Sequence, residues 1–338
     1  MSLNPILKKN IIQIGGEFYT NHFFKKKNYL KEIKQGTWTF SGRFALETIF
    51  LNNKDLCKKN IYIPIFNCPS VYKIVQKYFK KIYFYDLTNN FNPKLSNIKN
   101  NSIVLKVNYF GLKNNFNKNC LIIEDLSHSL LDLKNLKKKN IYFMSLRKLG
   151  IFNLGGWTNI IPKKKDYFTK KINFMKEFRK KKFLYLKKNI QDDMKEKKLL
   201  NDLKYQENKI LKIHNYIREN QIQVITNKSL SKIKSIRKRN FHFLMKNIKI
   251  KFLKFNFNSL STPMFFFLKF SNKNQRDVVR NKLIKKNIFC PILWKIKNKN
   301  LQKYPNSKKF SENLLPIPID HRIDLFRLKY MTRIINSL

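Results

Sequence analysis

A lysine, a carboxylate and a histidine lie within one stretch of the first half of the chain. Lys148 ends the motif Ser145-Leu146-Arg147-Lys148 and is followed by Gly155-Gly156. Asp125 and His128 precede it, in Glu124-Asp125-Leu126-Ser127-His128. In pyridoxal phosphate (PLP) sites, a lysine amine holds the aldehyde and a carboxylate faces the ring nitrogen. The residue types and their order therefore predict a PLP site.

Lys148 would act as the catalytic lysine of such a site. Its amine must be partly desolvated to be neutral near pH 7, and the neighbouring charge of Arg147 would favour the neutral form. Taken alone, a surface lysine at a strand end is the simpler interpretation, because the chain holds 72 Lys and Arg residues. Only the residues around Lys148 favour the functional interpretation.

Asp125 and His128 follow an apolar run that predicts a strand. A carboxylate at the end of that strand could pair with a protonated pyridine nitrogen and keep the ring an electron sink. His128 could contact the phenolic oxygen of the ring. A helix N-cap for Asp125 and a hydrogen-bonded loop residue for His128 remain open alternatives.

Ser41-Gly42-Arg43 predicts the start of a helix, with Ser41 as N-cap. A helix N-terminus attracts phosphate through its N–H groups and dipole, so Gly42 and Arg43 are candidate phosphate ligands. Ser145 could add a hydroxyl. A merely capped helix is the alternative, and the order of phosphate-type helix start, Asp and Lys favours the functional interpretation.

Composition indicates a globular chain with a large positive charge. The 338 residues are 43% hydrophobic, which suits one large domain and a smaller one. A formal net charge of +52 is typical of proteins that bind nucleic acid, but here the lysines are spread along the whole chain together with Asn, Ile, Phe and Tyr. Such a spread indicates a genome with AT-rich codons, so we expect no specific nucleic-acid partner. The positive charge still favours anionic substrates.

Glycine and cysteine usage narrows the possibilities further. The chain has 8 glycines, where average usage gives about 24, and all lie at or before Gly156. Because glycine is hard to replace where a ligand approaches the backbone, we expect the site in this half. The 4 cysteines include no CxxC pair, which argues against a zinc site. With no leader and no membrane-length apolar run, we expect a cytoplasmic protein without membrane contact.

Short apolar runs alternate with helical patterns and predict an α/β fold with a mostly parallel sheet flanked by helices. The strands are expected at residues 61–65, 82–85, 103–107, 121–123, 141–144 and 157–161, with helices at 42–51 and 71–79. Residues 1–40 are expected to be irregular and residues 163–239 mostly helical. Residues 264–270 and 288–293 predict strands and residues 275–286 a helix. The segment 314–318 and a terminal helix at 325–336 follow. We expect a PLP-binding large domain at 1–240 and a smaller α+β domain at 241–338.

Several motifs, taken in order, resemble the DegT/StrS family of PLP-dependent sugar aminotransferases, best over residues 36–160. The entry segment is Gly15-Gly16-Glu17-Phe18, the phosphate helix is Ser41-Gly42-Arg43-Phe44-Ala45-Leu46, and the loop that brings an aromatic over the ring is Pro64-Ile65-Phe66-Asn67-Cys68. The strand end is Tyr109-Phe110-Gly111, and the acid motif runs from Ile123 to His128. The lysine motif runs from Ser145 to Lys148 and is followed by Gly155-Gly156, and the C-terminal segment is Leu315-Pro316-Ile317-Pro318 with Asp320-His321-Arg322.

The resemblance implies the fold type I architecture, a homodimer and a catalytic Lys148 with Asp125 on the ring nitrogen. It also implies transamination, because Lys148 is present, whereas some relatives have His in place of the lysine and are dehydratases. Two features depart from the family pattern. Cys68 occupies the place of a stacking aromatic, which Phe66 or Tyr109 could supply, and the Asn-Tyr-Arg loop that reaches the neighbouring subunit has no clear counterpart after Gly156.

The substrates implied by the resemblance are an amino acid such as glutamate and a nucleotide-linked keto-sugar, used for surface polysaccharide or related biosynthesis. Another PLP reaction, by an amino-acid aminotransferase or a lyase, is one alternative. A basic binding protein on a degenerate enzyme fold is the other.

Overall fold

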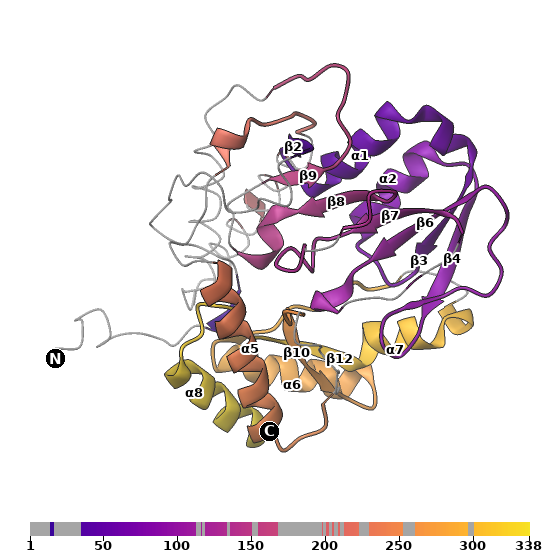
Figure 1. Cartoon of the computed structure of the whole chain (residues 1–338). Coiled ribbons are helices and arrows are strands. Elements are labelled where there is room, and N and C mark those ends of the chain that lie inside the picture. The colour runs from indigo at the N-terminus through magenta and orange to yellow at the C-terminus, as the bar shows by residue number, and fades with distance from the viewer. Residues whose placement is uncertain are drawn as a thin grey trace.

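The structure of the chain is a computed structural model. It describes residues 14–16, 35–112, 116, 119–133, 136–150, 155–167, 198, 201–202, 205, 209, 213–222, 230–252, 261–296 and 301–338. Figure 1 shows two groups of elements, a large sheet with its helices and a smaller group built from the C-terminal part of the chain.

The large group is built on an eight-stranded mixed sheet with the order β2-β9-β8-β7-β6-β3-β4-β5. The strands are β2 (Thr37–Thr39), β3 (Asn60–Pro64), β4 (Ile82–Leu87), β5 (Pro93–Lys94), β6 (Ser102–Val107), β7 (Leu121–Asp125), β8 (Ile141–Ser145) and β9 (Gly156–Thr158). β4, β3, β6, β7 and β8 run parallel, whereas β5, β9 and β2 pair antiparallel with their neighbours. The parallel strands are continuous apolar runs because both faces of the sheet are covered.

Two helices of the large group pack beside this sheet. α1 (Gly42–Asn52) packs against β8 and β9, and α2 (Pro69–Tyr78) packs against α1. The Ser41 hydroxyl accepts a hydrogen bond from the Phe44 N–H at 3.2 Å, which is the N-cap that the sequence predicts. Short 3-10 turns complete the described connections: η3 (Lys54–Lys58), η4 (Tyr109–Gly111), η5 (Leu146–Leu149), η6 (Glu219–Gln221) and η7 (Leu301–Lys303).

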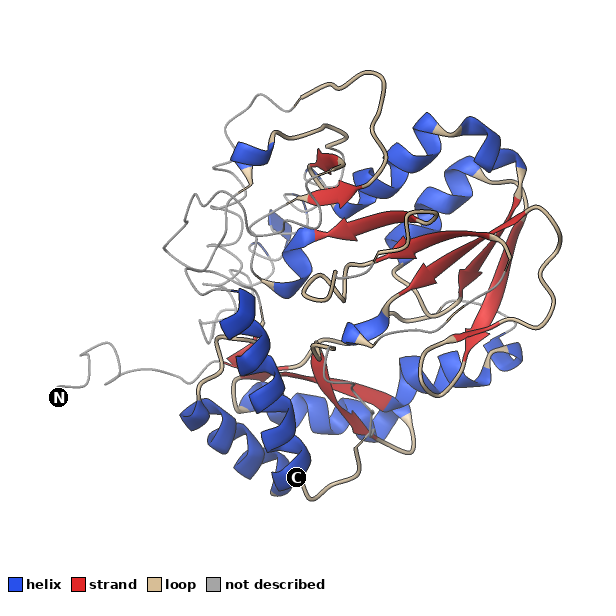
Figure 2. Ribbon diagram, in the orientation of Figure 1, coloured by secondary structure: helices blue, strands red, loops and turns tan. Residues whose placement is uncertain are grey.

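The smaller group has its own hydrophobic core. β10 (Phe265–Lys269) pairs antiparallel with β12 (Leu314–Pro318), and β1 (Ile14–Gly15) pairs parallel with β11 (Ile288–Phe289). The helices are α5 (Leu230–Asn247), α6 (Lys273–Lys285), α7 (Pro305–Asn313) and α8 (Leu325–Asn336). Figure 2 shows these helices around the short strands, and Phe266, Leu315 and Met331 are fully buried between them.

The strands predicted for the parallel part of the large sheet are confirmed as β3, β4, β6, β7 and β8, whereas the strand expected at 157–161 ends at Thr158 and β5 was not predicted. Two further expectations are wrong. Residues 1–40 contain β1 and β2 rather than only irregular chain. The strand expected at residues 288–293 ends at Phe289, shortly before Pro291, which has no N–H for a ladder. The prediction that residues 163–239 are mostly helical is confirmed in part. The described residues 198, 201, 202, 205, 209 and 230–239 are helical, whereas 163–167 and 213–222 form bridges and one 3-10 turn; the remaining residues of that stretch lie outside the described ones.

The division at residues 1–240 and 241–338 stays a prediction. The boundary falls inside α5, whose Phe241 and Leu244 belong to the smaller core together with Ile14 from the start of the chain. The described part of the chain contains no helix long and apolar enough to cross a membrane. It also contains no cluster of three or more His, Cys, Asp or Glu residues that could hold a metal ion.

Candidate active site

The carboxyl ends of β7 and β8 bring the acid motif beside the lysine motif. The two strands are parallel neighbours, with Asp125 in register with Phe143. Ser127 joins them: its N–H donates to the Asp125 Oδ1 at 2.8 Å, and its Oγ accepts from the Ser145 N–H at 2.9 Å. Asp125 and Ser145, which the sequence placed at two separate strand ends, thus share one hydrogen-bonded edge.

Asp125 is a buried carboxylate, with 7% of its surface exposed. Burial raises its pKa, because a charge loses solvation in the protein interior, while hydrogen bonds from Ser127 and the charge of Lys148 act in the opposite direction. A further N–H donor or a cation beside the Asp125 carboxylate would therefore stabilise its ionised form.

His128 lies in an aromatic stack. Its imidazole is 5.1 Å from the Phe110 ring, at an angle of 18°, and 5.5 Å from the Trp294 ring, at an angle of 5°. Burial, helped by the charge of Lys148, lowers the pKa of His128 to about 3, so the ring is neutral at physiological pH. Its Nδ1 is buried and has no hydrogen-bond partner within the described residues.

Lys148 extends from η5, the turn that directly follows β8. Lys148 is exposed, which differs from the partial desolvation expected for its amine. Its charge acts to lower the pKa of both Asp125 and His128. That shared influence indicates that the three predicted residues face a common region. The turn ends at Gly150, whose φ of 69° is a left-handed conformation that glycine adopts without strain.

The glycines of the phosphate and lysine motifs meet at the start of α1. A Cβ on Gly42 would lie 2.7 Å from the Ser145 Cβ, and a Cβ on Gly156 would lie 2.4 Å from the Ser41 carbonyl oxygen. Such distances are too short for any side chain, which explains why this glycine-poor chain keeps glycine here. The first turn of α1, with Gly42 and Arg43, is thereby held against Ser145.

Phe66 belongs to an aromatic cluster rather than to an open face. Its side chain is fully buried, 5.9 Å from the Tyr109 ring and 5.0 Å from Trp294, and the Tyr109 hydroxyl donates to the Phe66 carbonyl at 2.5 Å. The role of Phe66 as a residue that covers a cofactor ring stays a prediction. Trp294 contacts both Phe66 and His128 and was missed by the sequence analysis, because no local pattern ties it to them.

Lys148 also lines a pocket of about 340 Å³. The pocket reaches from the lysine turn to the smaller group of elements. Its charged lining consists of Lys148, Arg237, Arg280, Asp320 and Arg322. Asp320 and Arg322 belong to the C-terminal motif identified in the sequence, whereas Arg237 and Arg280 lie in no such motif. The charge of Lys148 also acts on Asp125 and His128, which belong to the large sheet and the turn that follows it.

Comparison with solved structures identifies the fold. Spr1654 of Streptococcus pneumoniae, described as a sugar aminotransferase, superimposes in its PMP form with a TM-score of 0.61 and 13% identity over 93% of this chain and 91% of that one. PseC of Helicobacter pylori, an aminotransferase of pseudoaminic acid biosynthesis, gives 0.57 and 13% over 94% and 92%. A DegT DnrJ EryC1 StrS aminotransferase of Brucella abortus gives 0.55 and 13% over 90% and 86%.

No protein-family model matches the chain, and no curated protein matches it. The likeness is therefore one of structure. The chain has the fold of the fold type I PLP-dependent transferases, as the resemblance of its motifs implies. The solved structures it resembles include sugar aminotransferases and one named as a DegT DnrJ EryC1 StrS aminotransferase.

Proposed function

We propose that this protein is a PLP-dependent aminotransferase that moves an amino group from an amino acid such as glutamate to a keto-sugar. The observation that carries the proposal is the convergence of Lys148, Asp125 and His128 at one edge of the parallel sheet. The fold type I architecture supports it, because ligands of such sheets bind at the carboxyl ends of the strands.

The residues at this edge fit PLP in three respects. Gly42 and Gly156 let the start of α1 pack directly on Ser145 and Ser41, so the N–H groups of its first turn lie beside Ser145 as candidate phosphate ligands. Asp125 offers a buried carboxylate to a ring nitrogen. His128 offers a buried Nδ1 without a partner in the described structure. The aldehyde, the pyridine nitrogen, the phenolic oxygen and the phosphate of the cofactor each have a candidate contact.

The roles of the chain's own residues follow from these contacts. Lys148 would hold the cofactor through its amine and, when released, would carry the proton between the substrate carbon and the cofactor. Asp125 would orient the ring and keep its nitrogen protonated, and His128 would bind the phenolic oxygen. Ser145, Gly42 and Arg43 would bind the phosphate, and Phe66 would support the ring. When bound, PLP supplies the electron sink for the reaction.

The substrate assignment rests on relatives and on charge. Spr1654 and CalS13 of Micromonospora echinospora are described as sugar aminotransferases, and PseC acts in the biosynthesis of pseudoaminic acid. The net charge of +52 and the cationic pocket beside Lys148 suit an anionic, nucleotide-linked sugar. We further propose a cytoplasmic homodimer, as in the family that the motifs resemble.

Incubation of the PLP-loaded protein with glutamate tests the reaction. An aminotransferase releases 2-oxoglutarate and accumulates the pyridoxamine form of the cofactor in equal amount. Release of ammonia, or of a decarboxylated or cleaved product, would instead indicate another PLP reaction and contradict the proposal. Steep salt-dependent binding to nucleic acid, without uptake of PLP, would favour a basic binding protein.

A further inference from the structure

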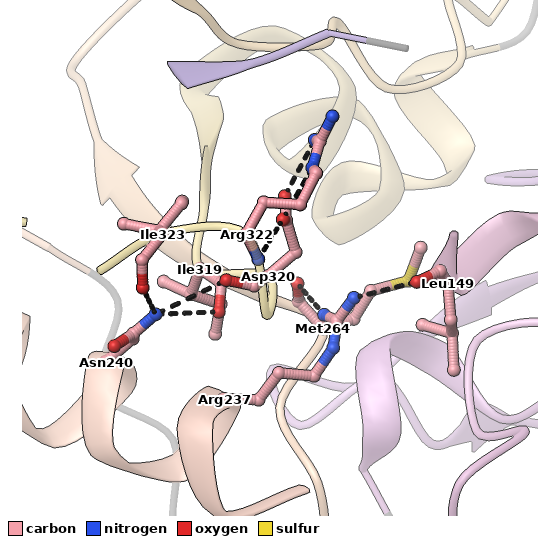
Figure 3. Close-up of polar contacts among 8 residues, drawn as sticks. All are labelled: Leu149, Arg237, Asn240, Met264, Ile319, Asp320, Arg322 and Ile323. Atoms are coloured by element: carbon pink, nitrogen blue, oxygen red, sulfur yellow. Dashed lines mark hydrogen bonds and ion pairs between the residues drawn. The ribbon is translucent and has the colours of Figure 1, made fainter. Parts of the chain in front are cut away.

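Arg237 is a buried arginine that joins three segments of the chain. It comes from α5 and is 2% exposed. Its Nη1 donates to the Met264 carbonyl at 3.1 Å and its Nη2 to the Leu149 carbonyl at 3.3 Å, as Figure 3 shows. Leu149 directly follows Lys148 and is the last residue of η5, whereas Met264 directly precedes β10. One guanidinium group therefore ties the turn that carries Lys148 to the smaller group of elements.

The positive charge of Arg237 makes these two hydrogen bonds costly to lose. Burial lowers the pKa of Arg237 to about 10, so the group is still charged at neutral pH. The charge of Asp320 acts on it, but both carboxylate oxygens of Asp320 accept from Arg322, at 2.8 Å and 3.0 Å. A buried guanidinium group depends on nearby carbonyl oxygens, because a charged donor left without an acceptor loses its solvation. The Leu149 carbonyl is therefore held toward Arg237.

α5 gives Arg237 a rigid base in the smaller group. Asn240, three residues further along the helix, is fully buried, and its Nδ2 donates to three backbone carbonyls of the segment 319–323, at 3.1 to 3.4 Å. Figure 3 shows these bonds beside those of Arg237. Phe241 and Leu244 of the same helix lie in the core of the smaller group. The position of Arg237 is therefore set by the smaller group, and the lysine turn is the part that it anchors.

A second contact ties α5 to the turn that follows the acid motif. The Lys234 Nζ, one helical turn before Arg237, forms an ion pair with the Asp132 Oδ1 at 3.5 Å. The Asp132 carboxylate also accepts from the Thr262 N–H at 2.6 Å and from the Thr262 hydroxyl at 2.9 Å. α5 and the segment that leads into β10 are therefore fixed to both turns that carry the candidate site residues.

The lysine turn has little internal structure to hold Lys148 in place. η5 is four residues long, and the Gly150 N–H donates to the Arg147 carbonyl at 3.2 Å. Short 3-10 turns have poorer hydrogen-bond geometry than α-helices. A contact from outside the turn, such as that of Arg237 with Leu149, therefore has a large share in fixing it.

We propose that Arg237 is a positioning residue for Lys148: it fixes the lysine turn against the smaller group and so keeps the amine at the edge of the sheet that carries Asp125. The inference rests on the proposed function for the chemistry of Lys148. The fixation of the turn can be measured on the protein without cofactor.

Hydrogen–deuterium exchange of the full-length protein without cofactor measures how firmly the lysine turn is held. The variants are Arg237→Gln, which removes the charge, and Arg237→Lys, which keeps it. Arg276→Gln and Arg276→Lys are the matched controls. Arg276 is also 2% exposed and donates its Nη1 to a carbonyl, that of Ser311 at 2.8 Å, but it joins α6 to α7. Thermal unfolding shows that each variant folds, and titration with PLP, followed by its visible absorbance, measures how tightly each one holds the cofactor.

We expect the peptide that covers residues 146–150 to exchange roughly tenfold faster in Arg237→Gln, because local opening of the turn no longer breaks a charged hydrogen bond. Arg237→Lys should recover part of the protection, since its ammonium group can reach one of the two carbonyls but lacks the fork of arginine. The Arg276 variants should be less stable than the wild type yet leave this peptide at the wild-type rate. PLP should be held several-fold more weakly by Arg237→Gln than by Arg276→Gln.

The proposal is overturned if this peptide exchanges in both Arg237 variants as in the wild type, or if the Arg276 variants accelerate it equally. It is also overturned if the turn loosens while PLP is held at Lys148 as tightly as in the wild type, since Arg237 would then be structural only. If Arg237→Gln does not fold, Arg237→Lys against Arg276→Lys decides. Failure of the proposed function gives a different pattern: the wild type takes up no PLP at Lys148, while the exchange still separates the Arg237 variants from the Arg276 variants.

Discussion

The Trp294 indole lies nearly parallel to the His128 imidazole, with ring centroids 5.5 Å apart and an angle of 5° between the ring planes. Trp294 comes from the part of the chain between β11 and α7, whereas His128 follows β7 of the large sheet. The contact therefore joins the C-terminal region to the acid motif. It also helps to bury the imidazole and keep it neutral.

The buried, neutral His128 predicts a specific pH dependence of stability. Because the pKa is about 3 in the folded protein and about 6.5 in the unfolded chain, the unfolded state binds more protons below pH 6.5. The free energy of unfolding should therefore fall as the pH decreases, by about 2 kcal/mol between pH 7 and pH 5 from this group alone.

Denaturant unfolding of the wild type and of His128→Gln, at pH 7 and pH 5, measures this contribution. The carboxylates and the other histidines are the same in both proteins, so their contributions cancel in the comparison. The variant should lose about 2 kcal/mol less than the wild type over this interval. Equal losses would show that His128 can be protonated in the folded protein.

The close approach of Gly42 to Ser145 predicts that Gly42→Ala destabilises the protein and that a second substitution, at Ser145, partly restores its stability. Gly42→Ala places a Cβ 2.7 Å from the Ser145 Cβ and should cost about 1–3 kcal/mol of unfolding free energy. Adding Ser145→Gly removes the nearest of the clashing atoms, although the Ser145 Cα, at 2.9 Å, remains. The double variant should therefore be more stable than the sum of the single changes implies, and strict additivity would contradict the close approach.

Asp86 should be a strong stabilising link between the large sheet and α7. Its Oδ1 accepts from the Ser307 N–H at 2.9 Å and from the Ser307 hydroxyl at 2.6 Å, and its Oδ2 accepts from the Asn306 N–H at 3.2 Å. Asp86→Ala leaves these donors unpaired near the start of the helix, at a cost of about 2–4 kcal/mol. Thermal or denaturant unfolding checks the value.

Asp55 provides the matched control for that experiment. Its carboxylate is 89% exposed and pairs only with a lysine three residues away, Lys58, within the described structure. Asp55→Ala should change the unfolding free energy by less than about 0.5 kcal/mol. Similar losses in both variants would mean that Asp86 contributes only surface charge.

The five parallel strands of the large sheet could be predicted from the sequence because they are mostly apolar runs, whereas β2 and β5 were not predicted. Asp125 and Ser145 lie at the ends of β7 and β8, as such runs indicate. The glycine cluster was also informative, since a chain with 8 glycines keeps them where a Cβ cannot fit.

The aromatic and cationic partners could not be predicted in this way. Trp294, Arg237 and Arg280 come from segments far along the chain, and only tertiary packing brings them to His128 and Lys148. β1 was missed because its two residues form a strand only by pairing with β11. The entry residues Glu17 and Phe18, which were part of one motif, lie outside the described residues.

The most direct test of the account is to locate the lysine that holds the cofactor. The protein is incubated with PLP, its visible absorbance is recorded, the complex is reduced with borohydride, and the modified peptide is mapped by mass spectrometry. Lys148→Ala is compared with Lys138→Ala, which removes an exposed lysine of a turn before β8. The account predicts a visible absorption band and a single label on Lys148, both lost in Lys148→Ala and kept in Lys138→Ala. A label on another lysine, or no absorbance after addition of PLP, would contradict it.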